Sequence, residues 1–166
     1  MNNYQPKNIL VTGGAGFIGC NYVRYMFANN DDIKIVNLDK LTYAGSMVNL
    51  RDLDDEFRHH FVQGDICDKQ LISQLLEQHS IDTIVHFAAE SHVDRSLIGP
   101  GEFITSNVVG TFTLLEAARE YWQQTNGLNE TQCRFHHIST DEVYGTLSAD
   151  DKAFTESTAY APNSPY

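Results

Sequence analysis

Two adjacent carboxyl side chains, Asp141 and Glu142, follow the segment 134–138, which is expected to form a buried strand. Ligands of parallel sheets bind beyond the carboxyl ends of the strands, so both carboxyls would lie near a ligand. Beside an apolar cavity, such a pair suits one general acid and one general base, because different environments separate their pKa values. The alternative is that Asp141 only caps the turn after the strand. The residue pattern leaves both interpretations open.

A glycine-rich turn at residues 12–19 is the second feature that could do chemistry. It follows an apolar strand segment at 8–11 and precedes apolar residues at helical spacing in 20–27. In such a unit one glycine permits a tight turn, one admits a ligand, and one packs the helix on the strand; these are Gly13, Gly16 and Gly19. The first N–H groups and the dipole of the helix favour a pyrophosphate here. No Gly-Lys-Ser/Thr sequence follows, which excludes a nucleoside-triphosphate loop.

Asp39 indicates which dinucleotide the turn would bind. It ends a second predicted strand at 33–38 and lies about 20 residues after Gly19. A carboxylate at this position binds the hydroxyls of the adenosine ribose. Because it also repels a 2′-phosphate, the sequence favours NAD over NADP as the cofactor.

Strands and helices that alternate along the chain would position these groups. Further strands are expected at 58–63, 82–87 and 134–138, and Asp68 is expected to cap a helix with one apolar stripe. The alternation predicts an α/β fold, a doubly wound parallel sheet of the Rossmann type. The strand ends supply the other candidate site residues, which are Asp65 and the segments 88–91 and 139–142.

A long helix is expected at about 103–122, and its apolar residues cover more than one stripe. We therefore expect it to pack both on the sheet and on something else, such as another subunit. Ser164 and Pro165 form a helix start at the end of the sequence. The chain is accordingly expected to continue, and its sheet to be truncated before the last strands.

Length and composition limit the number of domains and the classes of partner that the protein could have. A chain of 166 residues can bury one core, so one domain is expected at most over 1–166. The net charge of −11 argues against nucleic acid and anionic membranes as partners. No apolar run approaches the roughly 20 residues of a membrane span, and three scattered cysteines indicate reduced thiols in the cytoplasm. No metal site is predicted, because adjacent histidines in strands point to opposite faces.

Five stretches together resemble the extended short-chain dehydrogenase/reductase family, and within it the sugar-nucleotide 4,6-dehydratases. The stretches are residues 12–19, 39–45, 64–68, 88–96 and 137–145, and the resemblance covers nearly the whole chain. The glycine turn is common to the superfamily. The trio Thr140-Asp141-Glu142 is specific to the 4,6-dehydratases, because related epimerases lack the two acids.

The resemblance implies an NAD site. Its residues would be Gly13, Gly16, Phe17, Ile18 and Gly19 at the pyrophosphate, Asp39, Lys40, Leu41 and Thr42 at the adenosine ribose, Asp65 and Ile66 at the adenine, and Phe87, Ala88, Ala89, Glu90, Ser91 and Ser106 along the rest of the cofactor. It also implies a homodimer formed through the helix at 103–122, and a carboxy-terminal substrate domain that is absent from this sequence.

The implied reaction is the dehydration of dTDP-glucose to dTDP-4-keto-6-deoxyglucose, with transient hydride transfer to bound NAD. Tyr166 would take the proton of the 4-hydroxyl, Glu142 the proton on carbon 5, and Asp141 would protonate the leaving 6-hydroxyl. Thr140 and Ser91 would contact the substrate. The family's lysine, four residues after the tyrosine, would lie beyond residue 166. These 166 residues alone are therefore expected to be inactive.

Two alternatives stay open. One is a dehydratase or epimerase of another nucleotide sugar, because nothing in these residues identifies the base of the substrate. The other, for the bare 166 residues, is a dinucleotide-binding module without catalysis.

Overall fold

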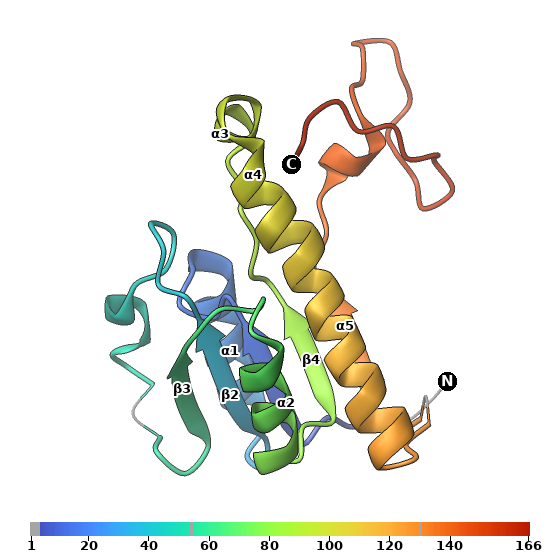
Figure 1. Ribbon diagram of the computed structural model, residues 1–166. Coiled ribbons are helices and arrows are strands. Elements are labelled where there is room, and N and C mark those ends of the chain that lie inside the picture. Colours follow the sequence, from blue (N-terminus) through green and yellow to red (C-terminus); the bar gives the residue numbers. More distant parts are fainter. Residues whose placement is uncertain (1–3, 54, 130) are drawn as a thin grey trace.

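The computed structural model describes residues 4–53, 55–129 and 131–166. Within them, five parallel strands form one sheet in the order β3-β2-β1-β4-β5. Helices cover both faces, so the predicted doubly wound, Rossmann-type α/β fold is confirmed (Figure 1). The strands are β1 (Asn8–Thr12), β2 (Lys34–Asp39), β3 (His59–Gln63), β4 (Thr83–His86) and β5 (Arg134–His137).

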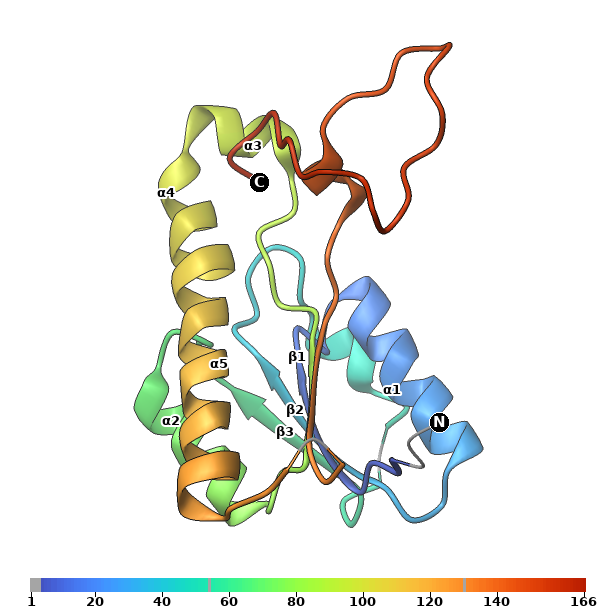
Figure 2. The ribbon, with the colours of Figure 1, turned by 90° about the vertical axis from the view of Figure 1, so that its right-hand side faces the viewer.

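The helices form two layers. Figure 2 shows α1 (Phe17–Asn29) on one face of the sheet, and α2 (Lys69–Gln78) with α5 (Thr111–Arg119) on the other. The predicted long helix exists and starts earlier than expected. It runs without a break through α4 (Pro100–Phe103), η2 (Ile104–Gly110), α5 and η3 (Glu120–Thr125), and η2 and η3 have the wider π-type turns. A short helix before it, α3 (Val93–Ile98), was not predicted.

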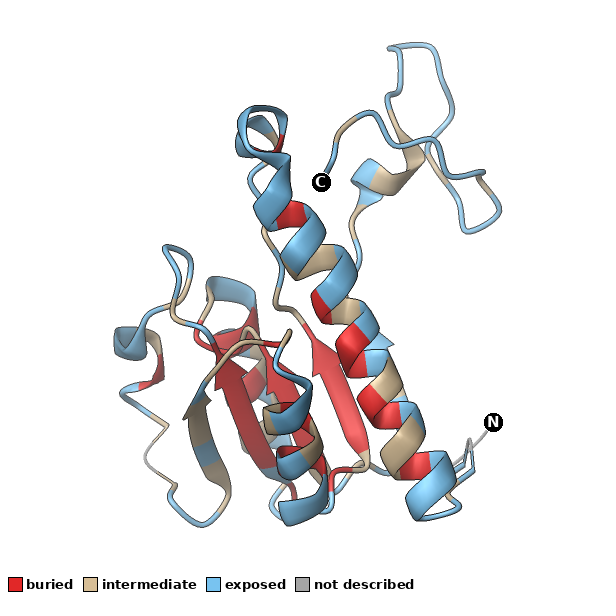
Figure 3. Ribbon diagram, in the orientation of Figure 1, coloured by how far each residue is buried: buried red, intermediate tan, exposed pale blue. Residues whose placement is uncertain are grey.

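The central strands β1, β2 and β4 are buried on both faces because helices cover both faces. The edge strand β5 was expected to be buried, but its residues are exposed or half-buried. Alternate residues of β1 point to opposite sides. Ile9 and Val11 join a core with Val23 of α1, whereas Leu10 joins a second core with Leu75 of α2 and Leu114 of α5. Figure 3 shows this burial concentrated on the central strands and on the side of α5 that faces them. A continuous apolar strand is what a parallel sheet between two helix layers requires.

Hydrogen bonds fix the helices at the ends of the sheet. Asp68 Oδ1 accepts from Leu71 N at 3.0 Å, so the predicted cap of α2 is confirmed. Trp122 Nε1 donates to Ile81 O at 2.6 Å and holds the end of the long helix at the base of β4. Of the helices in the described ranges, none is long and apolar enough to cross a membrane.

The order of the strands in the sheet, which differs from their order along the chain, creates a crevice. The connections from β1 to β2 and from β2 to β3 run to one side of β1, and the connection from β3 crosses to β4 on its other side, so the strand order reverses beside β1. In such sheets, ligands bind outside the carboxyl ends of the strands at this switch point. Residues 138–166 rise beyond that end, with η4 (Asp141–Tyr144) directly after β5 (Figures 1 and 2). The sheet therefore places the loops after all five strands around one edge.

Candidate functional site

A cavity of about 390 Å³ lies at the carboxyl edge of the sheet. The loops that follow all five strands contribute to its wall, and so does the long helix through Ser106. Its volume lies within the range of small-molecule and cofactor sites. The edge at which doubly wound sheets bind ligands thus holds a cavity of suitable size.

The glycine turn forms the floor of this cavity by close backbone contacts. Gly13 has φ of +72°, and a Cβ on it would lie 2.7 Å from the backbone nitrogen of Ala88. A Cβ on Gly19 would overlap the carbonyl oxygen of Gly13, which agrees with the predicted close packing of helix on turn. Gly14 was not predicted to matter, yet a Cβ there would overlap Asn37 Oδ1. That contact depends on a neighbouring strand, so the turn sequence alone does not reveal it.

The amino terminus of α1 presents free donors to the cavity. Its N-cap, Gly16, has no side chain to satisfy the first N–H groups, and those groups have no intrahelical acceptor. The side chains of Phe17 and Ile18 are 81% and 63% exposed and line the cavity. Backbone donors and the positive end of the helix dipole together favour an anion at this position.

Asp39 is a buried carboxylate in a fixed orientation, only 8% exposed. Its Oδ2 accepts from Ala15 N at 2.9 Å, and its Oδ1 accepts from Leu41 N at 2.8 Å. A Cβ on Gly45 would lie 2.6 Å from Oδ1, so this glycine lets the following loop close over the carboxylate. Each oxygen keeps a lone pair for a further donor, such as a ribose hydroxyl.

Lys40 and Asp65 face each other across the next part of the wall. Their Nζ and Oδ2 atoms are 2.8 Å apart, and Asp65 Oδ1 also accepts from Cys67 N at 2.9 Å. Burial alone would raise the pKa of Asp65, but the Cys67 N–H and the Lys40 ammonium bring this pKa below its ordinary value. The hydrogen bond to Asp65 in turn raises the pKa of Lys40. This pair closes the side of the cavity beyond β3.

The loop after β4 is held against the long helix by one side chain. Asn107 Oδ1 accepts from Glu90 N at 2.8 Å, and Asn107 Nδ2 donates to Glu90 O at 2.9 Å. Glu90 therefore reaches the cavity wall with its backbone N–H and carbonyl fixed. Ser106, the neighbour of Asn107 in η2, lines the same cavity.

The predicted acid–base residues lie apart from this wall. Thr140 Oγ1 accepts from Glu142 N at 3.2 Å, so the residue that caps η4 is Thr140 and not Asp141. Asp141 and Glu142 are exposed and do not line the cavity. Tyr166 does line it, with its ring edge-to-face against Phe103 at a centroid distance of 6.3 Å. The cavity thus contains the tyrosine, while the two acids stand outside it.

Nearly all of the predicted cofactor residues line the cavity. The exception is Leu41, whose side chain packs on the core formed by Ala15, Cys20 and Leu50. Its left-handed backbone, with φ of +57°, carries the side chain away from the cavity while its N–H binds Asp39. Ser139, a candidate from the sequence, lines the cavity as well, and the wall residues not predicted from the sequence are Leu38, Ala44, Gly45, Gly64 and Ile138. Their positions near strand ends were the available signal.

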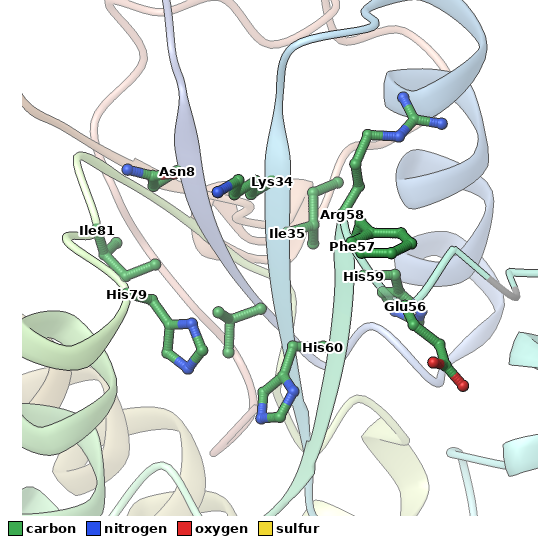
Figure 4. Close-up of a pocket in the computed structure, with 11 residues that line it drawn as sticks. Asn8, Lys34, Ile35, Glu56, Phe57, Arg58, His59, His60, His79 and Ile81 are labelled. Atoms are coloured by element: carbon green, nitrogen blue, oxygen red, sulfur yellow. The ribbon is translucent and has the colours of Figure 1, made fainter.

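A smaller cavity of about 210 Å³ lies at the opposite, amino edge of the sheet. His60 and His79 line it with their ring centroids 5.0 Å apart (Figure 4). His59 points to the other face, where its Nδ1 lies 3.1 Å from Leu53 O. Across the described parts of the chain, no cluster of three or more His, Cys, Asp or Glu side chains could hold a metal ion.

The parallel sheet, the glycine turn and the cavity at the switch point define a Rossmann-type α/β domain. The model of a family described as GDP-mannose 4,6 dehydratase matches residues 10–166. The chain belongs to this family.

Comparisons with individual proteins show higher sequence identity to dehydratases than to an epimerase. A dTDP-glucose 4,6-dehydratase of Neisseria gonorrhoeae is 57% identical over 166 residues, which are 100% of this chain and 48% of that protein. The dTDP-glucose 4,6-dehydratase DesIV of Streptomyces venezuelae, solved with NAD and TYD bound, is 46% identical with a TM-score of 0.82 over 96% of this chain and 47% of that one. A UDP-Glc/GlcNAc 4-epimerase of Campylobacter jejuni is 32% identical with a TM-score of 0.80, over 96% and 44% of the two chains. The chain spans about half the length of the curated relatives it matches.

Proposed function

We propose that this chain supplies the cofactor site and part of the catalytic site of an NAD-dependent dTDP-glucose 4,6-dehydratase. The observation that carries the proposal is one cavity that brings together the glycine turn, Asp39 and Tyr166. The 57% and 46% identities to dehydratases of that specificity support it, and the epimerase is less similar at 32%.

The residues of the cavity fit NAD. Gly13 and Gly19 leave backbone surface that any Cβ would fill, and the start of α1 offers uncapped N–H groups to a pyrophosphate. Asp39 is held ready to accept from ribose hydroxyls and would repel the 2′-phosphate of NADP. When bound, NAD would supply the hydride acceptor and donor that a dehydration without net oxidation needs.

The acid–base steps fall to the chain's own residues. Tyr166 would take the proton of the 4-hydroxyl of the sugar, and Thr140 and Ser91 would hold the sugar by hydrogen bonds. Glu142 would remove the proton on carbon 5, which a ketone at carbon 4 makes acidic. Asp141 would protonate the 6-hydroxyl, which leaves as water.

The position of η4 is compatible with these roles. Ser139 lines the cavity, and Thr140, Asp141 and Glu142 follow it directly. A sugar that extends outward from the cavity would therefore reach η4. The exposure of both acids then leaves them free to meet a substrate at the mouth of the cavity.

We also propose that the protein forms a homodimer through the long helix. One side of this helix packs on the sheet through Leu114, Ala117 and Trp122. Its other side exposes an apolar stripe that consists of Ile104, Val108, Phe112 and Leu115, with exposed fractions of 50%, 57%, 62% and 46%. Exposed apolar stripes of this kind mark protein–protein contacts. A monomeric mass at micromolar concentration would contradict the dimer.

The function is tested by incubating the intact protein, loaded with NAD, with dTDP-glucose and separately with UDP-glucose. Mass spectrometry should show loss of one water from dTDP-glucose. Epimerisation of UDP-glucose without water loss would favour the epimerase alternative. Tight NAD binding without turnover of either sugar would favour the non-catalytic module.

A further inference from the structure

His86 is a buried imidazole that the proposed reaction does not use. It ends β4 and is 1% exposed. Its Nδ1 lies 2.6 Å from Thr12 Oγ1 at the end of β1, and its Nε2 lies 3.0 Å from Thr111 Oγ1 at the start of α5. One ring thus joins two central strands to the long helix.

The Thr12 hydroxyl continues this chain of hydrogen bonds to the cavity. Its Oγ1 accepts from the backbone N–H of Ala88 at 3.3 Å. Ala88 lines the cavity, and its nitrogen is the atom that a Cβ on Gly13 would approach to 2.7 Å. The hydroxyl therefore holds the point where the loop after β4 touches the glycine turn.

The surroundings select one tautomer of the ring. Thr12 is 0% exposed and already accepts from Ala88, so its own hydroxyl proton needs an acceptor inside the protein. An unprotonated Nδ1 on His86 provides that acceptor, which places the ring proton on Nε2, facing Thr111. The opposite tautomer would leave the buried Thr12 proton unpaired, whereas Thr111 is partly exposed and can use water.

We propose that His86 is a positioning residue: as a neutral ring protonated on Nε2, it orients the Thr12 hydroxyl, which holds the Ala88 N–H and sets the cavity wall against the glycine turn. The effect on cofactor binding rests on the proposed function. The effect on the wall itself does not, because it is a property of the protein without ligand.

The environment keeps the ring neutral. Burial and the neighbouring His137 lower the pKa of His86 to about 4. The groups packed around the ring are Thr12 of β1, Thr111 of α5, and Phe135 and His137 of β5, with ring-centroid distances of 6.1 Å and 5.2 Å for the last two. Of these only His137 titrates, so the hydrogen-bond chain should persist through the neutral range.

Two substitutions of His86 distinguish its role in orienting the Thr12 hydroxyl from its role in packing the core. In His86→Asn the amide oxygen can take the place of Nδ1 and accept from Thr12. In His86→Gln the longer side chain places its amide near Nε2, so the contact with Thr111 can survive and the acceptor for Thr12 is lost. Ile84→Val, a loss of one buried methylene on the same strand, controls for destabilisation of the core.

The first measurement uses the intact protein without ligand. Nitrogen chemical shifts of the His86 ring should show protonation on Nε2 alone. Exchange of the Ala88 amide hydrogen should be about tenfold faster in His86→Gln than in wild type, the effect of losing about one buried hydrogen bond. It should stay within about twofold of wild type in His86→Asn and Ile84→Val. A proton on Nδ1, or equal acceleration in the Asn and Gln variants, overturns the proposal.

A second pair of variants tests the hydroxyl itself. Thr12→Val removes the acceptor for Ala88 without changing the shape of the side chain, and Thr12→Ser restores it. Ala88 exchange should accelerate about tenfold in the first and return to near the wild-type rate in the second. NAD titration of the same variants should show the same order of dissociation constants. If wild type binds no NAD, the proposed function fails, and the exchange rates alone decide this inference.

Discussion

The two edges of the sheet each hold a cavity, but they are built from different groups. At the carboxyl edge, glycines, backbone atoms and the buried carboxylate of Asp39 are fixed by hydrogen bonds or close contacts, and Lys40 is paired with Asp65 beside them. The amino edge has exposed or half-buried ionisable side chains, including Lys34, His60 and His79.

The contrast has a physical cause. Backbone N–H groups at a helix start cannot rotate away, and a buried carboxylate with two backbone donors has lost its freedom before any ligand arrives. Binding to such groups has little ordering entropy left to overcome. By contrast, His60 and His79 at the amino edge are exposed or half-buried, and a ligand would first have to order their imidazoles. If function follows this difference, substitutions at the carboxyl edge should change cofactor binding and turnover, and substitutions at the amino edge should change neither.

The largest effects should come from the two acids beside the carboxyl edge. Glu142→Gln and Asp141→Asn in the intact protein should each slow water loss by about 100- to 10,000-fold, because each removes a positioned acid or base. A substrate with fluoride in place of the 6-hydroxyl should rescue Asp141→Asn, since fluoride leaves without a proton. It should not rescue Glu142→Gln, which still lacks its base. Equal rescue of both variants would show that the two roles are misassigned.

Gly13→Ala tests the close contact between the glycine turn and the loop after β4. Its matched control is Gly127→Ala, because Gly127 has a similar φ of +62° but no atom within 4 Å of the place that a Cβ would take. Both variants should lose about 1–2 kcal/mol of stability from the left-handed backbone. Only Gly13→Ala must displace Ala88, which should weaken NAD binding by about 100-fold. Equal NAD affinities in the two variants would contradict the contact's role.

Asp39→Ala tests the buried carboxylate. Loss of the charged acceptor should weaken NAD binding by about tenfold or more and bring the affinities for NAD and NADP closer together. Asp68→Ala is the control, because it removes the cap of α2 outside the cavity and should lower stability without changing cofactor preference. Wild-type protein that binds NADP as tightly as NAD would contradict the assignment.

The smallest effects should come from the amino edge. Burial, with a contribution from His60, keeps the pKa of His79 below its ordinary 6.5. Just below pH 6.5 the unfolded chain therefore binds a proton that the folded chain does not, and stability falls as the pH falls. His79→Asn should make this fall shallower in denaturant titrations at pH 7 and pH 5.5, and should leave NAD affinity unchanged. A loss of NAD affinity would place function at the wrong edge.

The sequence predicted the strands well because apolar runs such as Ile9 to Val11 are covered on both faces, which leaves a clear pattern. Asp39 was found from its distance to the glycine turn. What the sequence could not show depends on contacts between segments. Gly14 matters through Asn37 of another strand, and Leu41 leaves the cavity wall through its left-handed backbone.

Two further differences between the sequence-based prediction and the structure, the cap of η4 and the helix α3, have local causes. Thr140 has an extended backbone, with φ of −137°, that turns its hydroxyl toward the N–H of Glu142, so it caps η4 in place of Asp141. The short α3 has too few residues to show an apolar period.

Hydrogen exchange of the intact protein, measured with and without NAD, shows directly which edge of the sheet binds the cofactor. We expect NAD to slow exchange around the carboxyl-edge cavity, in residues 13–19, 39–45, 64–66 and 87–91. Residues 58–60 and 79–81, at the amino edge, should exchange at the same rate in both samples. Protection at the amino edge, or no protection at the glycine turn when NAD is saturating, would contradict this expectation.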